Sequence, residues 1–160
     1  MKATDKNENG AAASESASLE NRQLFYDHSS ATLCSLDRGP LAGLRHRTVI
    51  EHTTGSKQLA LWQEEHLPGF AVPLHLHDCE EIITVVMGAI EGQIRDEKFV
   101  IKAQQSFLIP EGEPHGFRVI GDGPMRLLAL FSSSNPKIFR LDETESHPPW
   151  KGGTSNHLDT

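Results

Sequence analysis

Short apolar runs rich in β-branched or aromatic side chains recur along the chain and alternate with clusters of turn-forming residues. The run Ile82-Ile83-Thr84-Val85-Val86-Met87 shows this pattern clearly, and Gly88 follows it at a turn. β-Branched side chains fit the pleated surface of a sheet, so these runs predict β-strands. We predict strands over residues 32–36, 47–52, 58–66, 81–87, 89–95, 98–101, 106–109, 116–120 and 125–132. Many short strands at this spacing predict an all-β sandwich or barrel.

The same pattern divides the chain into three parts. Residues 1–22 are rich in Ala, Ser, Glu and Asn with few large apolar side chains, which predicts a disordered or loosely ordered arm. Residues 23–141 contain all the predicted strands and form one domain, long enough to bury a core. We place a short helix near residues 136–141. Residues 142–160 form an irregular C-terminal tail.

Histidine and acidic residues concentrate just before the clearest strand. Side chains alternate between the two faces of a strand. A strand running unbroken from residue 75 to residue 81 would therefore point His75, His77 and Glu81 to one side, and Asp78 and Glu80 to the other. This alternation favours Glu81 over Glu80 as a partner of the histidines, unless a β-bulge interrupts the strand.

A second segment, Ile109-Pro-Glu-Gly-Glu-Pro-His-Gly-Phe117, adds a further imidazole. Its prolines and glycine bend the chain, after which His115, Phe117 and Val119 share one face of a new strand. If this strand lies beside the first segment, His115 completes a set of three imidazoles and one carboxylate that suits one divalent transition metal. A single histidine is more often an ordinary surface or core residue, but this combination of residues and spacing is hard to obtain by chance.

The first segment resembles the first motif of the cupin superfamily. Gly69, five residues, His75-Leu-His77, three residues, Glu81, six residues and Gly88 fill every fixed position of that motif. The resemblance covers about residues 44–131. It implies a cupin-type jelly-roll β-barrel (a double-stranded β-helix) with a single domain, in which His75, His77, Glu81 and His115 bind one metal ion.

The second cupin motif is matched in part. Pro110, Gly112 and His115 stand at the expected places, whereas Gln104 replaces a usual glycine and Val119 a usual asparagine. The departures concern the turn before Phe107 and one contact outside the ligand set, and no ligand is lost.

Composition narrows the partners and the location. The formal net charge of −7 argues against nucleic acid as a partner. No apolar run approaches the roughly 20 residues of a membrane span, and the N-terminus lacks the apolar stretch of a secretory signal. Cys34 and Cys79 form no metal or redox pattern, so we expect a reducing, cytoplasmic location. Exposed sheet edges and the cupin resemblance lead us to expect a homodimer.

Three neutral histidines and one glutamate leave a charge near +1 on a divalent ion and leave coordination positions open. Iron is the metal we expect first, and manganese, zinc, nickel, cobalt and copper accept the same ligands. We predict a metal-dependent oxygenase acting on a small chelating substrate, such as a dicarbonyl, a hydroxy acid or a phenolic compound. The alternatives are a non-oxidative isomerase, lyase or decarboxylase, and a small-molecule-binding protein without turnover.

Aromatic and apolar residues near the two segments are candidates for a substrate pocket. Each of them also fits plain packing of the barrel interior, and no catalytic acid or base stands out. The candidates are Trp62, Met87, Phe107, Phe117 and Phe131.

Overall fold

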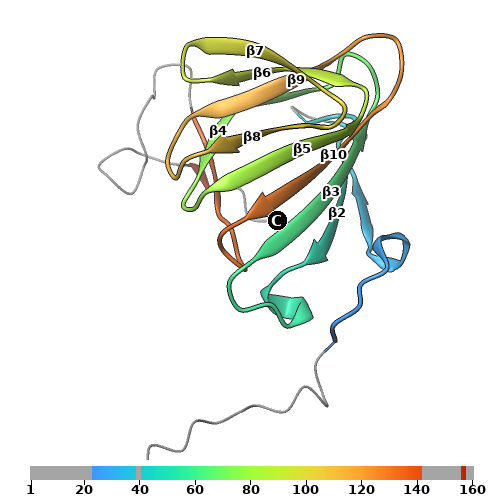
Figure 1. Ribbon diagram of the computed structural model, residues 1–160, viewed down its shortest axis with the longest axis vertical. Coiled ribbons are helices and arrows are strands. Elements are labelled where there is room, and N and C mark those ends of the chain that lie inside the picture. The colour runs from blue at the N-terminus through green and yellow to red at the C-terminus, as the bar shows by residue number, and fades with distance from the viewer. Residues whose placement is uncertain (1–22, 39–40, 142–155, 158–160) are drawn as a thin grey trace, which may run out of the picture.

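The fold consists of two six-stranded antiparallel sheets that face each other and enclose one core (Figure 1). The computed structural model describes residues 23–38, 41–141 and 156–157. Sheet A runs in the order β1 (Leu33–Ser35), β2 (Arg45–Ile50), β3 (Ala60–His66), β10 (Met125–Phe131), β5 (Glu81–Met87) and β8 (Gln105–Ile109). Sheet B runs in the order β12 (Asn156–His157), β11 (Ile138–Arg140), β4 (Ala71–His77), β9 (His115–Ile120), β6 (Ala89–Ile94) and β7 (Glu97–Lys102). The predicted all-β jelly-roll barrel is confirmed.

Two 3-10 turns, η2 (His28–Ser30) and η3 (His52–Thr54), complete the described elements. None of the helices in this part of the chain has the length and apolar composition of a transmembrane segment. The predicted N-terminal arm, residues 1–22, lies outside the described residues. Of the predicted tail, residues 156–157 are described as a strand, and they pair with β11.

One local prediction was wrong, and one predicted strand has different bounds. The segment predicted as a helix over residues 136–141 contains strand β11, which pairs with β4 through Ile138, Phe139 and Arg140. The hydrogen-bonding edge of β4 overrides any local helical tendency there. The predicted strand over residues 47–52 instead spans Arg45–Ile50, because Glu51 begins the turn η3 through a reciprocal capping contact with Thr54.

The strand expected to run unbroken from residue 75 to residue 81 does not exist. The chain bends at residues 78–80, so His77 ends β4 in sheet B and Glu81 begins β5 in sheet A. The alternation argument for Glu81 therefore fails, although the choice of Glu81 holds for another reason. Its side chain is buried at the start of β5, whereas Glu80 is exposed.

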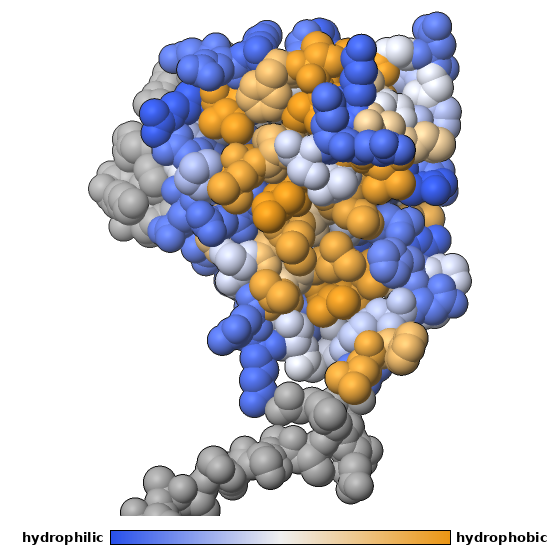
Figure 2. Space-filling view, in the orientation of Figure 1, coloured by the Kyte–Doolittle hydropathy of each residue, from blue (hydrophilic) through white to orange (hydrophobic). Residues whose placement is uncertain are grey.

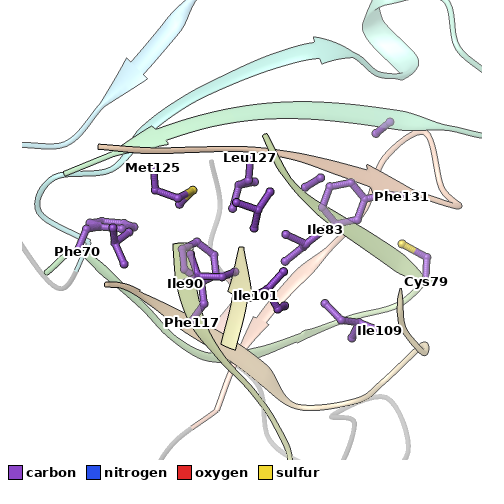
Figure 3. Close-up of a cluster of buried hydrophobic side chains, with 14 residues drawn as sticks. Phe70, Cys79, Ile83, Ile90, Ile101, Ile109, Phe117, Met125, Leu127 and Phe131 are labelled. Carbon is purple, nitrogen blue, oxygen red and sulfur yellow. The ribbon is translucent and has the colours of Figure 1, made fainter. Parts of the chain in front are cut away.

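The core lies between the sheets and is built from alternate residues of the strands. Along β10, Met125, Leu127, Ala129 and Phe131 are all buried, with at most 2% of each residue exposed. Figure 3 shows the side chains of Leu127 and Phe131 from this strand converging with Ile83, Ile90 and Ile101 from other strands. Burial of this size stabilises the sandwich by the hydrophobic effect.

The outer face of sheet A is also partly apolar. Leu61, Leu130, Ile82 and Leu108 are aligned across the neighbouring strands β3, β10, β5 and β8. The last three are at least 37% exposed, and Figure 2 shows apolar side chains gathered on this face. Both faces of β5 are thus apolar, which explains why its sequence reads as a continuous apolar run rather than an alternating one.

Candidate metal centre

The four predicted ligands come together at one end of the barrel interior. His75, His77, Glu81 and His115 each direct one ligand atom to a common region, and these atoms all lie within 4.8 Å of one another. Ligands on opposite sides of an ion are separated by about 4.2 Å when each bond is about 2.1 Å long. The spacing therefore fits coordination of a single divalent metal ion.

Backbone register places the histidines. His75 and His77 stand two residues apart on β4 and share its inner face. His115 begins β9 and lies directly opposite His75 in the pairing of the two strands. Gly116 permits this close approach, because a Cβ atom there would lie 2.7 Å from the carbonyl oxygen of Val72. A side chain at residue 116 would therefore push β9 and its histidine away from β4.

The loop before His115 is tied to both neighbouring segments. The amide of Gly112 donates to the carbonyl oxygen of His77 at 3.0 Å, and the amide of Arg95 donates to the carbonyl oxygen of Pro114 at 2.8 Å. The Arg95 guanidinium also forms a two-pronged ion pair with Glu113. The turn before Phe107 is retained, with Gln104 in the left-handed conformation (φ 69°) that a glycine would ordinarily occupy.

The histidine tautomers follow from three backbone carbonyl groups. Nδ1 of His75 lies 3.0 Å from the carbonyl oxygen of Pro73. Nδ1 of His77 lies 2.8 Å from the carbonyl oxygen of Lys137, and Nδ1 of His115 lies 2.8 Å from the carbonyl oxygen of Glu113. A carbonyl oxygen only accepts hydrogen bonds, so each Nδ1 carries the proton. Each Nε2 then presents a lone pair, which is the arrangement that metal-binding histidines require.

Two of the converging atoms lie close together without forming a hydrogen bond. Nε2 of His115 and Oε2 of Glu81 lie 2.9 Å apart, and both are buried without a hydrogen-bond partner among the described residues. In a neutral His115 ring with its proton on Nδ1, Nε2 and Oε2 of Glu81 are both acceptors and repel each other. A cation between them removes this repulsion, so the donor set fits a metal ion.

Burial keeps His75 and His77 uncharged. The exposed fractions are 2% for His77, 4% for Glu81 and 1% for His115. Burial lowers the pKa of His77 to about 3, and repulsion from His115 adds to this. The pKa of His75 falls well below its usual value for the same reasons, burial first and then repulsion from His115 and His77. Neutral rings at neutral pH are ready to bind a metal without losing a proton.

Two of the predicted pocket residues lie at this centre. The ring centroid of Phe131 lies 4.9 Å from that of His77, and the centroid of Trp62 lies 6.2 Å from it. Trp62 and Phe131 also contact each other at 4.4 Å. They form an aromatic wall beside the ligands.

The other three pocket candidates have different neighbours. Phe117 packs toward His66, with ring centroids 6.2 Å apart, and Phe107 packs against Phe99 at 5.4 Å. Met87 is 37% exposed at the far end of β5, six residues and about 20 Å along the strand from Glu81.

Sequence reasoning missed a second polar group inside the barrel. Glu64 lies 2.8 Å from Nε2 of His66 and 3.7 Å from Nδ1 of His46. Burial opposes its charge, but its contacts with His46 and His66 outweigh burial and lower the pKa of Glu64 to about 2. The signal was present in the sequence, since Trp62, Glu64 and His66 alternate with Gln63 and Glu65 and so share the inward face of β3.

Comparison with known proteins agrees with the fold. Residues 62–131 match the family model described as a cupin domain. This match indicates a cupin domain over residues 62–131, and the jelly-roll architecture agrees with it.

Two curated relatives and one solved structure illustrate the similarity. Auxin-binding protein 1 of Arabidopsis thaliana is 29% identical over 111 residues, which cover 63% of this chain and 56% of the relative. Polyketide synthase CurC of Streptomyces cyaneus is 32% identical over 100 residues, or 62% of each chain. The chain thus spans less than two thirds of the length of these relatives. The polyketide cyclase RemF of Streptomyces resistomycificus superposes with a TM-score of 0.62 at 23% identity, over 78% of this chain and 89% of that one.

Proposed function

We propose that this cupin is a divalent-metal enzyme that acts on a small organic substrate able to chelate the metal through two oxygen atoms. The observation that carries the proposal is the convergence of three imidazoles and one carboxylate, in which the buried Nε2 of His115 and Oε2 of Glu81 lie 2.9 Å apart without a hydrogen bond. Dicarbonyl compounds and phenols with a neighbouring hydroxyl or carbonyl group are substrate classes that fit, since both present paired oxygen atoms to a metal.

The chain's own residues orient the ligands and exclude water. The carbonyl groups of Pro73, Lys137 and Glu113 hold the three rings through Nδ1, which fixes where each Nε2 points. Trp62 and Phe131 cover one side with apolar surface and strengthen electrostatic interactions in the site by keeping water away. A divalent ion held there would polarise a bound carbonyl oxygen and stabilise the negative charge of an enolate or phenolate.

The reaction we propose first is oxygenation with iron as the metal. Elemental analysis of protein purified without added metal, followed by oxygen-electrode measurements of the iron-loaded protein with acetylacetone and catechol, tests this proposal. We expect oxygen uptake by the native protein and none by a His77→Ala variant. A native protein that neither retains nor takes up a divalent metal contradicts the proposed function.

A second candidate is a non-oxidative reaction of an enolisable substrate, which the similarity to a protein named as a polyketide synthase favours. The two reactions differ in their need for oxygen. Turnover of a 1,3-dicarbonyl compound under strict anaerobiosis, preserved when zinc or manganese replaces iron, would favour the second candidate and exclude oxygenation.

A further inference from the structure

A polar cluster lies inside the barrel apart from the metal ligands. His46 of β2 and Glu64 of β3 are direct partners in the pairing of these strands, and His66 follows Glu64 on the same inward face. Nε2 of His66 lies 2.8 Å from one carboxylate oxygen of Glu64, and Nδ1 of His46 lies 3.7 Å from the other. Nε2 of His46 is engaged with the hydroxyl of Thr48 at 2.9 Å.

This cluster is costly for a barrel that needs only to fold. The side chain of Glu64 is 12% exposed, and that of His66 is fully buried. Removing a carboxylate from water is unfavourable even where it gains a partner, and apolar residues in such positions often give a more stable protein. A charge retained among the core residues therefore points to a binding role.

A second observation points to a ligand at the same place. Nε1 of Trp62 is a buried hydrogen-bond donor without a partner in the described part of the chain. Trp62 stands two residues before Glu64 on the inward face of β3, and its ring contacts His46 at 4.8 Å between centroids. The ring also reaches across to His77 of the opposite sheet at 6.2 Å, so the Trp62 ring lies between the polar cluster and the metal ligands.

We propose that Trp62 and Glu64 form a subsite that binds a hydroxyl group of the substrate, beyond the oxygen atoms that bind the metal. The indole N–H donates to the hydroxyl oxygen, and the hydroxyl donates its own hydrogen to the Glu64 carboxylate. A hydroxyl group satisfies both partners because it donates and accepts at one atom. A carboxylate at the same place is disfavoured, because it cannot donate and is repelled by Glu64.

The inference rests on the proposed function and narrows its substrate to phenols and enols with an additional hydroxyl group. Binding can be measured without turnover by calorimetry on the zinc-loaded protein under anaerobic conditions. The probes are 2-hydroxyacetophenone, its three ring-hydroxylated derivatives with the new group at position 4, 5 or 6, and the corresponding carboxylated derivatives. We expect at least one hydroxylated probe to have an affinity about tenfold higher than that of the parent compound. A gain of this size corresponds to one additional hydrogen bond to a charged group. The carboxylated probes should bind more weakly than the parent.

Two variants and one matched control complete the experiment. Glu64→Gln should reduce the preference for the hydroxylated probe by about tenfold and relieve the exclusion of the carboxylated probes. Trp62→Phe should also reduce the preference for the hydroxyl group while the aromatic wall remains. Glu65→Gln removes a charge from the neighbouring residue, which is 43% exposed on the outer face and paired with Arg126 at 3.2 Å, and should change none of the affinities.

Metal content is measured for every variant, so a lost ligand shell is not mistaken for a lost subsite. Equal affinities of the native protein for all the probes, or a hydroxyl preference that survives both Glu64→Gln and Trp62→Phe, overturns the inference. A failure of the proposed function appears separately, as absent metal or absent turnover.

Discussion

Mild acid should destabilise the metal-free protein, because its buried histidines resist protonation. The pKa of His77 is about 3 in the folded chain, against 6.5 for an unperturbed histidine. Between these two values the unfolded chain binds a proton that the folded chain does not. Stability therefore falls as the pH drops below 6.5, and it is fully present only above that value.

The expected loss follows from linkage. Between pH 7.5 and 5.5 the unfolded form of one such histidine gains about 1.4 kcal/mol from protonation, and the folded form gains almost nothing. The pKa of His75 is lowered in the same direction and adds to the effect. A loss of this size is a substantial part of the roughly 5–15 kcal/mol that stabilises a typical domain. The Glu64 carboxylate does not contribute, because its pKa of about 2 in the folded chain and the ordinary glutamate pKa of 4.5 confine its effect to lower pH.

Urea unfolding in the presence of EDTA, repeated from pH 7.5 to 5.5, measures this loss. A His77→Gln variant should lose about 1.4 kcal/mol less stability over that range than the native protein. His52→Gln is the matched control, because His52 is exposed in the turn η3, and its pH dependence should equal that of the native protein. The same pH dependence in His77→Gln and the native protein would show that His77 is not held neutral by burial.

Three further outcomes are expected. Glu81→Gln should strip the metal while Glu80→Gln retains it in elemental analysis, since only Glu81 faces the histidines; the reverse would place the carboxylate ligand wrongly. Cys34, which is exposed, should react with maleimide at pH 7.5. Buried Cys79, whose pKa is raised to about 12 by burial and by the charges around it, should react only after unfolding, as mass spectrometry will show. Phe131→Ala should lower the unfolding free energy by about 3–5 kcal/mol in urea titrations, and a loss below about 1 kcal/mol would contradict its place in the core.

Most of the strands could be predicted because each is a short apolar run with a clear boundary. Strand β5 begins and ends as predicted, since both of its faces are apolar and Gly88 follows it. The segment after Pro136 could not be predicted, because its strand β11 depends on pairing with β4. The local sequence does not indicate which sheet edge a strand will pair with.

The polar residues on the inward face of β3 show a second reason why sequence-based prediction was incomplete. The strand Ala60–His66 was predicted, but Glu64 and His66 look like ordinary surface residues in a run of Gln, Glu and His. Only the burial of Ala60 and the contact of Trp62 with His77 fix which face of the strand is inside. Charge in a sequence is normally taken to indicate solvent, so a buried carboxylate is found only when the strand faces are assigned from neighbouring strands.

The four candidate ligands could be predicted, but the arrangement of strands that brings them together was not. Spacing together with the resemblance to the cupin motifs selected His75, His77, Glu81 and His115, but they do not lie along a single strand. The three histidines belong to sheet B, and Glu81 is supplied by sheet A after the bend at residues 78–80. A shell drawn from both sheets needs the barrel to be closed before its four atoms can meet. Metal bound there would therefore favour the closed barrel over any state in which the sheets separate, and binding would add directly to folding stability.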